Sequence, residues 1–178
     1  MKVLLHVCCG PCALYPLKVL REEGCEVHGY FFNPNIHPYA EYRRRQETLA
    51  AYAESEGWPV IHAREYPVEE YFRMVAYRES ERCRFCYRLR LAKAAGVAKH
   101  GGFDAFTTTL LGSPFQKHGL LRETGEAVAA EYGIPFLYRD FRVGFKEGVA
   151  RSRERGMYRQ QYCGCIFSEK ERFFREDV

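Results

Sequence analysis

Short apolar runs alternate with longer amphipathic stretches along the whole chain, and this alternation restricts the fold more than any other feature. Strands separated by helices predict βαβ units, which build a mainly parallel sheet with helices on both faces. We therefore predict a doubly wound α/β fold with a five-stranded sheet. The predicted strands are residues 2–7, 27–32, 60–63, 103–110 and 136–138, and the predicted helices are residues 13–23, 39–56, 68–77, 84–99 and 117–132.

The length of the chain sets its domain organisation. A chain of 178 residues is ordinary for one domain with a sizeable core. No stretch has the composition of a linker, so we expect a single domain over residues 1–178. Its last part, residues 140–178, is expected to be a mainly helical C-terminal extension with interruptions at Gly144, Gly148 and Gly156.

The beginning of the chain bears on its compartment. Only a short apolar run precedes His6 and Cys8, and it is far too short for a signal peptide or a membrane span. We therefore expect a cytoplasmic protein with no membrane partner. Thiols stay reduced in that compartment, so eight cysteines predict metal ligands or redox thiols in place of disulfides.

Seven of the eight cysteines lie in three motifs that are far apart in the sequence. They are His6-Val-Cys8-Cys9-Gly-Pro-Cys12, Cys83-Arg-Phe-Cys86 and Cys163-Gly-Cys165. Closely spaced thiolates bind zinc, copper(I) or iron–sulfur clusters. Because the three motifs meet only when the whole domain folds, we predict a metal site that the C-terminal extension closes.

The cysteine pattern leaves several interpretations open. Seven thiols exceed the four ligands of a structural zinc site, which leaves two metal centres or one cluster beside redox thiols. A Cys-x-x-Cys pair at a helix start also fits redox chemistry, since the helix dipole stabilises a thiolate with or without metal. The adjacent Cys8 and Cys9 would serve two neighbouring centres, or one of them would belong to the core. Cys25 has no partner motif, so we expect it in the core.

The loops after the predicted strands share one edge of the sheet. In a doubly wound sheet, ligands bind at the carboxyl ends of the strands. Residues 8–12, 33–38, 107–114 and 140–142 follow the first, second, fourth and fifth strands, so they are predicted to form one site. The Asn and Pro residues of 33–38 are equally typical of turns, and the threonines of 107–114 of strands. His6 lies inside a strand, where a hydrogen-bonded core histidine is the expected role.

Basic residues concentrate near the C-terminal end. Residues 139–159 carry seven Arg or Lys against three Asp or Glu, a difference that equals the net charge of +4 of the chain. Aromatic residues lie among them, which is typical of contact with unstacked RNA and also of a solvated helix face. The loop after the first strand contains cysteines where a Gly-rich phosphate cradle would lie, so we do not predict hydrolysis of a nucleoside triphosphate.

Taken together, the motifs resemble the cobalamin-independent epoxyqueuosine reductases, the QueH family. The resemblance covers almost the full chain, in order. Besides the three cysteine motifs, the matching elements are Asn33-Pro-Asn-Ile-His37-Pro38 with Tyr42 and Arg45, Thr107-Thr-Thr-Leu-Leu111 with Ser113, Asp140-Phe-Arg142, Ser152-Arg153 and Tyr158-Arg-Gln-Gln-Tyr162.

The resemblance implies a fold like that of the adenine-nucleotide α-hydrolase (HUP-like) group and the reduction of epoxyqueuosine to queuosine in tRNA. It also implies a [4Fe–4S] cluster and a second metal ion, expected to be iron. Many relatives carry Asp at the position of Cys12, so Cys12 is expected to replace a carboxylate ligand with sulfur. The cysteines expected to bind the cluster or the second metal are Cys8, Cys9, Cys12, Cys83, Cys86, Cys163 and Cys165.

The expected reaction removes an epoxide oxygen, which needs two electrons, two protons and an external electron donor. The tRNA anticodon loop is the expected macromolecular partner. Cys12 and Asp140 are the predicted catalytic residues, with Asp140 orienting the substrate or a water molecule. The predicted substrate-binding residues are Asn33, Asn35, His37, Tyr42, Arg45, Thr108, Thr109, Ser113, Arg142 and Arg153.

Two alternative functions remain open from the sequence. A sulfur-transferring tRNA-modifying enzyme on a similar fold would carry persulfide on its cysteines and activate the base with ATP. The missing phosphate loop disfavours it. A zinc-stabilised RNA-binding module would contain zinc, absorb no visible light and have no redox activity.

Overall fold

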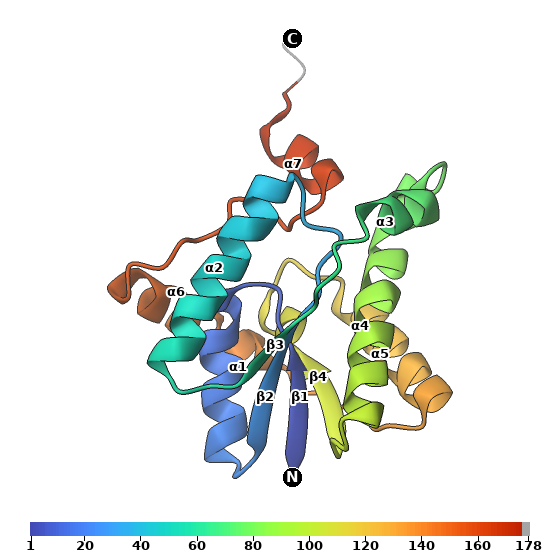
Figure 1. Cartoon of the computed structure of the whole chain (residues 1–178). Helices are drawn as coiled ribbons and strands as arrows, with labels where there is room; N and C mark the ends of the chain where they lie inside the picture. The colour runs from blue at the N-terminus through green and yellow to red at the C-terminus, as the bar shows by residue number, and fades with distance from the viewer. Residues whose placement is uncertain (176–178) are drawn as a thin grey trace.

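Four parallel strands form the central sheet of the computed structural model, which describes residues 1–175 (Figure 1). The strands are β1 (Lys2–His6), β2 (Glu26–Phe31), β3 (Val60–His62) and β4 (Ala105–Thr108), in the order β3-β2-β1-β4. The chain steps outward from β1 to β3 and then crosses to the other side of β1 to form β4. The strand order therefore reverses between β1 and β4, which is the position where doubly wound sheets bind ligands.

The predicted fifth strand is the largest error in the predicted sheet, and the predicted fourth strand, 103–110, is shorter in the structure because Thr109 and Leu110 belong to a 3₁₀ helix. Phe136 makes a single parallel bridge to Phe106 and no longer ladder. The N–H of Phe106 donates to the carbonyl of Pro135 at 3.0 Å, and the N–H of Leu137 donates to the carbonyl of Phe106 at 2.8 Å. Pro135 has no N–H with which to extend the pairing. The sheet thus has four strands and not five, while the predicted parallel α/β class is confirmed.

Helices cover both faces of the sheet (Figure 1). On one face lie α1 (Gly10–Glu22) and α2 (Tyr39–Ser55), and on the other lie α4 (Arg82–His100) and α5 (His118–Tyr132). These boundaries agree with the predicted ones to within three residues. The shorter elements of this part of the chain are α3 (Val68–Val75) and the 3₁₀ helices η1 (Glu79–Glu81) and η2 (Thr109–Gly112).

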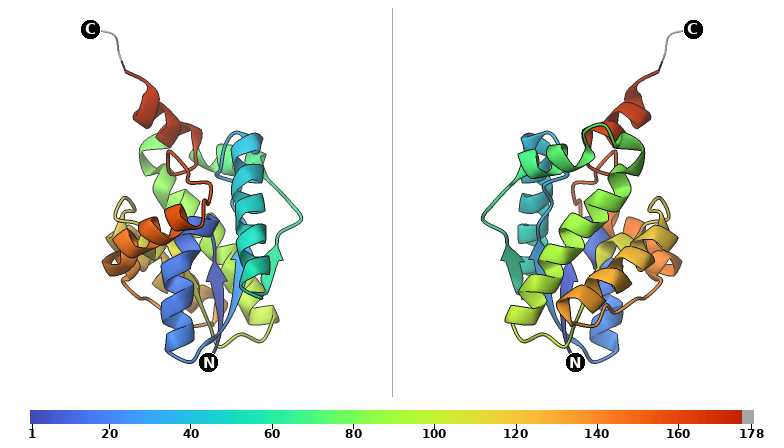
Figure 2. Two further views of the ribbon diagram at one scale, coloured as in Figure 1. Left: turned by 90° about the vertical axis from the view of Figure 1, so that its left-hand side faces the viewer. Right: turned by 90° about the vertical axis from the view of Figure 1, so that its right-hand side faces the viewer.

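The C-terminal segment returns to the carboxyl edge of the sheet (Figure 2). It contains η3 (Phe141–Gly144), α6 (Phe145–Glu154) and α7 (Ile166–Phe173). Gly144 permits the close approach to α1, because a Cβ atom there would lie 2.2 Å from the Tyr15 ring. Gly148 lies inside α6, so the predicted interruption at that residue is wrong. A helix tolerates an interior glycine at a cost of about 1 kcal/mol.

Across the part of the chain that the structure describes, residues 1–175, every helix is too short or too polar to span a bilayer.

Candidate metal and substrate site

The first cysteine group, Cys8, Cys9 and Cys12, lies where the strand order reverses. Cys8 and Cys9 form the turn between β1 and α1, and Cys12 lies in the first turn of α1. The three sulfur atoms lie within 4.8 Å of one another, and the Sγ atoms of Cys8 and Cys9 are 3.8 Å apart. Three thiols at this spacing can ligate one metal ion and leave a further coordination position open.

Cys8 is the thiol of this group that ionises most easily. Hydrogen bonds from Cys12, Cys9 and Thr109 hold the pKa of Cys8 well below its ordinary value, whereas burial raises the pKa of Cys9. Thr109 follows the end of β4, and its hydroxyl donates to Cys8 Sγ at 3.3 Å. The thiolate is the form that binds metal. Residues at the ends of the two strands at the reversal point therefore favour the thiolate form of Cys8, which is the form that a metal ion would require.

His6 supports the turn between β1 and α1 from inside the sheet. It is fully buried, and burial lowers its pKa to about 4, so the ring is neutral near pH 7. Its Nε2 lies 3.1 Å from the carbonyl oxygen of Phe32, which can only accept, so Nε2 carries the proton. Its Nδ1 then accepts from the hydroxyl of Thr108 at 2.9 Å. The predicted role of a hydrogen-bonded core histidine is confirmed.

The second cysteine group joins α4 to the C-terminal turn. Cys83 and Cys86 lie in the first turns of α4, and Cys163 and Cys165 immediately precede α7. Burial is the largest cause that raises the pKa of Cys83 and raises that of Cys86 to about 12, and the charges of Cys163 and Cys165 contribute to both increases. The four thiols therefore share one electrostatic environment. Their number and type match the four-cysteine ligand set of a [4Fe–4S] cluster.

Arg45 holds the C-terminal turn in place. Its side chain is 1% exposed and its Nε donates to Glu41 at 2.7 Å. Its two terminal nitrogens donate to the carbonyls of Cys163 and Tyr162 at 2.9 and 3.0 Å. The guanidinium is thus fully engaged by the protein. This placement favours a structural role over the substrate-binding role that the sequence predicts.

The loop after β2 supports the same turn. The N–H of His37 donates to the carbonyl of Gly164 at 2.8 Å, and the ring Nδ1 of His37 accepts from the N–H of Ile166 at 3.3 Å. Gly164 has a φ of +150°, and a Cβ atom there would lie 3.1 Å from Ile36, so the turn favours glycine. Asn33 donates to the carbonyl of Val7 at 2.9 Å. The structure also buries Asn35 and Tyr42. Of these predicted substrate residues, His37 and Asn35 lie against the C-terminal turn, whereas Asn33 holds the end of β1.

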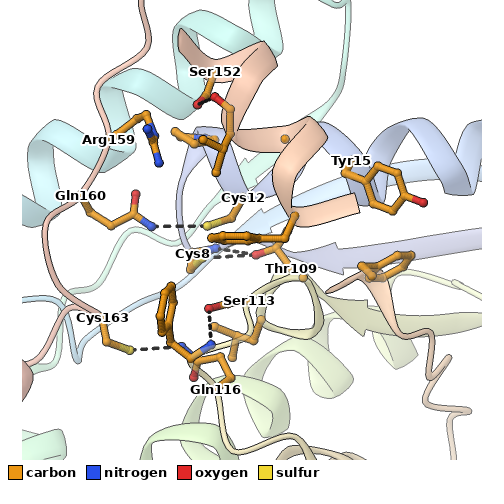
Figure 3. Close-up of a pocket in the computed structure, with 18 of the residues that line it drawn as sticks. Cys8, Cys12, Tyr15, Thr109, Ser113, Gln116, Ser152, Arg159, Gln160 and Cys163 are labelled. Carbon is orange, nitrogen blue, oxygen red and sulfur yellow. Dashed lines mark hydrogen bonds between the residues drawn. The ribbon is translucent and has the colours of Figure 1, made fainter. Parts of the chain in front are cut away.

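A cavity of about 480 Å³ lies between the two cysteine groups (Figure 3). Cys8 and Cys12 of the first group and Cys163 of the second line it. Cavities of this size hold small ligands or single bases. Of the predicted substrate residues, Thr109 and Ser113 lie in its wall. Phe141, from the predicted site loop 140–142, also lies in the wall. Further lining residues, which the sequence analysis did not assign to the site, are Phe115, Gln116, Phe145, Ser152, Arg159 and Gln160.

Two of these lining residues are glutamines that contact the two cysteine groups separately (Figure 3). Gln160 Nε2 donates to Cys12 Sγ at 3.4 Å, and Gln116 Nε2 donates to Cys163 Sγ at 3.3 Å. Hydrogen bonds to ligand atoms orient and tune metal ligands. Gln160 lies three residues before Cys163, which is a usable sequence signal. Gln116 reaches the site only through the fold.

Four other predicted site residues lie outside the cavity wall, namely Thr108, Asp140, Arg142 and Arg153, and the hydroxyl of Thr108 donates to His6 instead. Asp140 accepts from the backbone N–H and the Nε of Arg142 at 3.1 and 2.7 Å, and so caps η3. The same pairing lowers the pKa of Asp140 to about 2. Arg153 is exposed on α6. This geometry favours a capping role for Asp140 over the predicted catalytic role.

The fold and the site define a doubly wound α/β protein with two thiol groups around a cavity at the strand-order reversal. A solved structure of a predicted subunit of tRNA methyltransferase from Methanocaldococcus jannaschii has a similar fold, with a TM-score of 0.57. The likeness covers 86% of this chain and 75% of that chain at 16% sequence identity, so it shows the fold alone.

Family comparisons then identify the chain more closely. The family model described as epoxyqueuosine reductase QueH matches residues 3–171. An epoxyqueuosine reductase QueH from Dehalococcoides mccartyi is 39% identical over 97% of this chain and 94% of its own length. Another epoxyqueuosine reductase QueH, from Thermotoga maritima, is 37% identical over 96% of this chain and 91% of its own length. The chain belongs to the epoxyqueuosine reductase QueH family, which confirms the resemblance seen in its motifs.

Proposed function

We propose that the chain reduces epoxyqueuosine in tRNA to queuosine. The observation that carries this proposal is the cavity whose wall contains thiols of both cysteine groups, in a chain of this family. The proposed reaction takes up two electrons and two protons, breaks both C–O bonds of the epoxide, and yields an alkene and water. An external donor supplies the electrons.

The two cysteine groups divide the proposed cofactors between them. Cys83, Cys86, Cys163 and Cys165 would hold a [4Fe–4S] cluster, because four thiols from two segments share one environment. Cys8, Cys9 and Cys12 would hold the second metal ion, expected to be iron, because their sulfur atoms lie within 4.8 Å of one another. When bound, these groups supply single electrons and a Lewis acid.

The chain itself supplies the binding site. Phe115 and Phe145 lie in the cavity wall with their ring centroids 5.9 Å apart, and the Phe115 side chain is 82% exposed. Exposed aromatic rings stack on unpaired bases of RNA loops. Aromatic walls also exclude water from a bound base. Gln116 and Gln160 place amide groups against the cysteines from both sides of the cavity.

Ion pairs within the protein reduce the number of arginines that we expect to contact RNA phosphates. Several arginines of the basic stretch are neutralised within the protein. Arg155 pairs with Glu56 at 2.6 Å, and Arg142 with Asp140 at 2.5 Å. Arg159 of this stretch lines the cavity, as does Arg172 on α7. We expect these two residues to contribute most to phosphate binding, and the binding to weaken steeply with salt because counterions are released.

The test uses protein reconstituted with iron and sulfide under anaerobic conditions. Given epoxyqueuosine-containing tRNA and a low-potential reductant, without cobalamin or ATP, it should yield queuosine. Nucleoside mass spectrometry measures the loss of one oxygen atom from the base. Cys25→Ser is the matched control, since Cys25 belongs to neither group.

Two results would contradict the proposal. In one, metal-replete protein leaves the epoxide unchanged, while ATP and a sulfur donor yield a thiolated base. In the other, the protein contains zinc and no iron–sulfur cluster and has no reductase activity.

A further inference from the structure

Two arginines of the described chain are fully buried, and they differ in their counter-charges. Arg45 is 1% exposed and pairs with the carboxylate of Glu41. Arg90 is 2% exposed, and its Nη2 and Nε donate to the thiol and the carbonyl of Cys86 at 3.0 and 3.2 Å. Within residues 1–175, no carboxylate lies within salt-bridge distance of Arg90.

A buried guanidinium without a negative partner is unfavourable. Arginine does not lose its proton in proteins, so it cannot avoid the cost of a buried charge by becoming neutral. The loss of hydration of one buried ion costs several kcal/mol unless an opposite charge compensates it. A negative charge is therefore expected within reach of Arg90.

Cys86 of the second cysteine group supplies that charge when it binds metal. Its sulfur atom accepts a hydrogen bond from Arg90 Nη2 at 3.0 Å. A cysteine binds a metal or an iron–sulfur cluster as the thiolate, so a centre held by Cys86 places negative charge directly against the guanidinium. Arg90 thus donates directly to an expected ligand of the proposed cluster.

The position of Arg90 follows from the helix that carries it. Arg90 lies four residues after Cys86 on α4, so both side chains share one helix face. Arg84 and Arg88 of the same helix point outward, where they pair with Glu123 and Glu131 at 3.2 and 2.9 Å. Of these three arginines, only Arg90 is buried.

We propose that Arg90 is the fixed counter-cation of the metal–thiolate centre and that it favours the reduced state of the cluster. The inference rests on the proposed function, which places the cluster at the second cysteine group. Each added electron makes the centre more negative, and a fixed positive charge in a low-dielectric interior stabilises that form. Arg90 therefore acts as a positioning residue, through Cys86, on the reduction potential.

The experiment compares Arg90→Gln, Arg90→Lys and Arg88→Gln in reconstituted full-length protein. Iron and sulfide per chain are measured, and the reduction potential is followed by a spectroscopic titration. Arg90→Gln should lower the equilibrium constant for reduction at least tenfold, which for one electron corresponds to a potential 59 mV more negative. Arg90→Lys, which keeps the charge, should remain close to the wild type. Arg88→Gln should change nothing.

The outcomes distinguish an effect of the positive charge of Arg90 from an effect of the packing of its side chain. If Arg90→Gln keeps the cluster at an unchanged potential, the inference is wrong. If Arg90→Gln cannot fold or load the cluster, the result for Arg90→Lys tests the charge role instead. Loading at a near-wild-type potential supports the charge role, and a defect as severe as that of Gln overturns it. A wild-type protein without an iron–sulfur cluster would instead refute the proposed function, which separates the two failures.

Discussion

The two cysteine groups reach the same cavity but are built in different ways. Cys8, Cys9 and Cys12 lie within five consecutive residues at the junction of β1 and α1, so secondary structure alone brings them together. The second group joins the start of α4 to a turn about 80 residues later in the chain. That turn depends on hydrogen bonds from Arg45 and His37. The second group should therefore be the more sensitive to changes elsewhere in the protein.

The largest expected effect is the loss of a ligand from either group. Cys8→Ser and Cys163→Ser should each reduce activity by more than the ~10–100-fold typical for loss of a residue that supports a ligand. Metal analysis should separate them, because Cys163→Ser should lose the cluster while the first group keeps its iron. Cys25→Ser should retain both the cluster and the iron at the first group. Loss of all metal from Cys8→Ser with full retention in Cys163→Ser would reverse the assignment.

The next largest effect concerns the support of the C-terminal turn. Arg45→Met removes one partner of a buried ion pair, which should lower the free energy of unfolding by about 3–5 kcal/mol. Cluster content should fall while iron at the first group remains. Arg43→Met on the same helix is the matched control. Arg43 forms an exposed pair with Glu47, so its loss should change stability by about 0.5 kcal/mol or less.

Denaturant unfolding of the metal-loaded variants measures the difference. Equal destabilisation by the two substitutions would contradict the structural role of Arg45, and simultaneous loss of metal from both groups in Arg45→Met would show that the two groups are not built independently.

A smaller effect is expected from the glutamines. Gln160→Ala removes the amide donor to Cys12 and should weaken iron binding at the first group about 10-fold. The second group should be unaffected. Gln161→Ala is the neighbouring control, since Gln161 donates to the carbonyl of Arg159. Metal titration monitored by absorbance checks both variants, and an equal loss in both would assign the effect to the loop as a whole.

The smallest effect is expected at Asp140, which lies outside both groups. Asp140→Asn should lower stability by less than about 1 kcal/mol near pH 7, because the Arg142 pair is solvent-exposed. The folded pKa of Asp140 is lowered to about 2, so the stabilisation is present above the unfolded value of about 3.9. It should disappear as the pH falls through about 2. Thermal unfolding against pH measures this, and metal content should not change.

Local features of the sequence determined much of this protein. Hydrophobic periodicity identified the five helices up to residue 132 to within three residues, and the parallel α/β class, because periodicity depends only on neighbouring residues. Cysteine spacing identified the group of Cys8, Cys9 and Cys12, whose sulfur atoms lie within 4.8 Å of one another, and the combined motifs identified the family. The fifth strand was wrong because its extent depends on how far residues 136–138 run alongside β4, which no local pattern encodes.

Tertiary structure alone decided which polar side chains face the cavity and which support it. In the sequence, Arg45, Arg90 and Arg153 are equivalent cations. Packing buries Arg45 against the C-terminal turn and Arg90 against Cys86, and leaves Arg153 in solvent. Gln116 reaches Cys163 across 47 residues of sequence. The physical reason is that burial and long-range hydrogen bonds depend on the simultaneous placement of distant segments, whereas periodicity and ligand spacing are properties of adjacent residues.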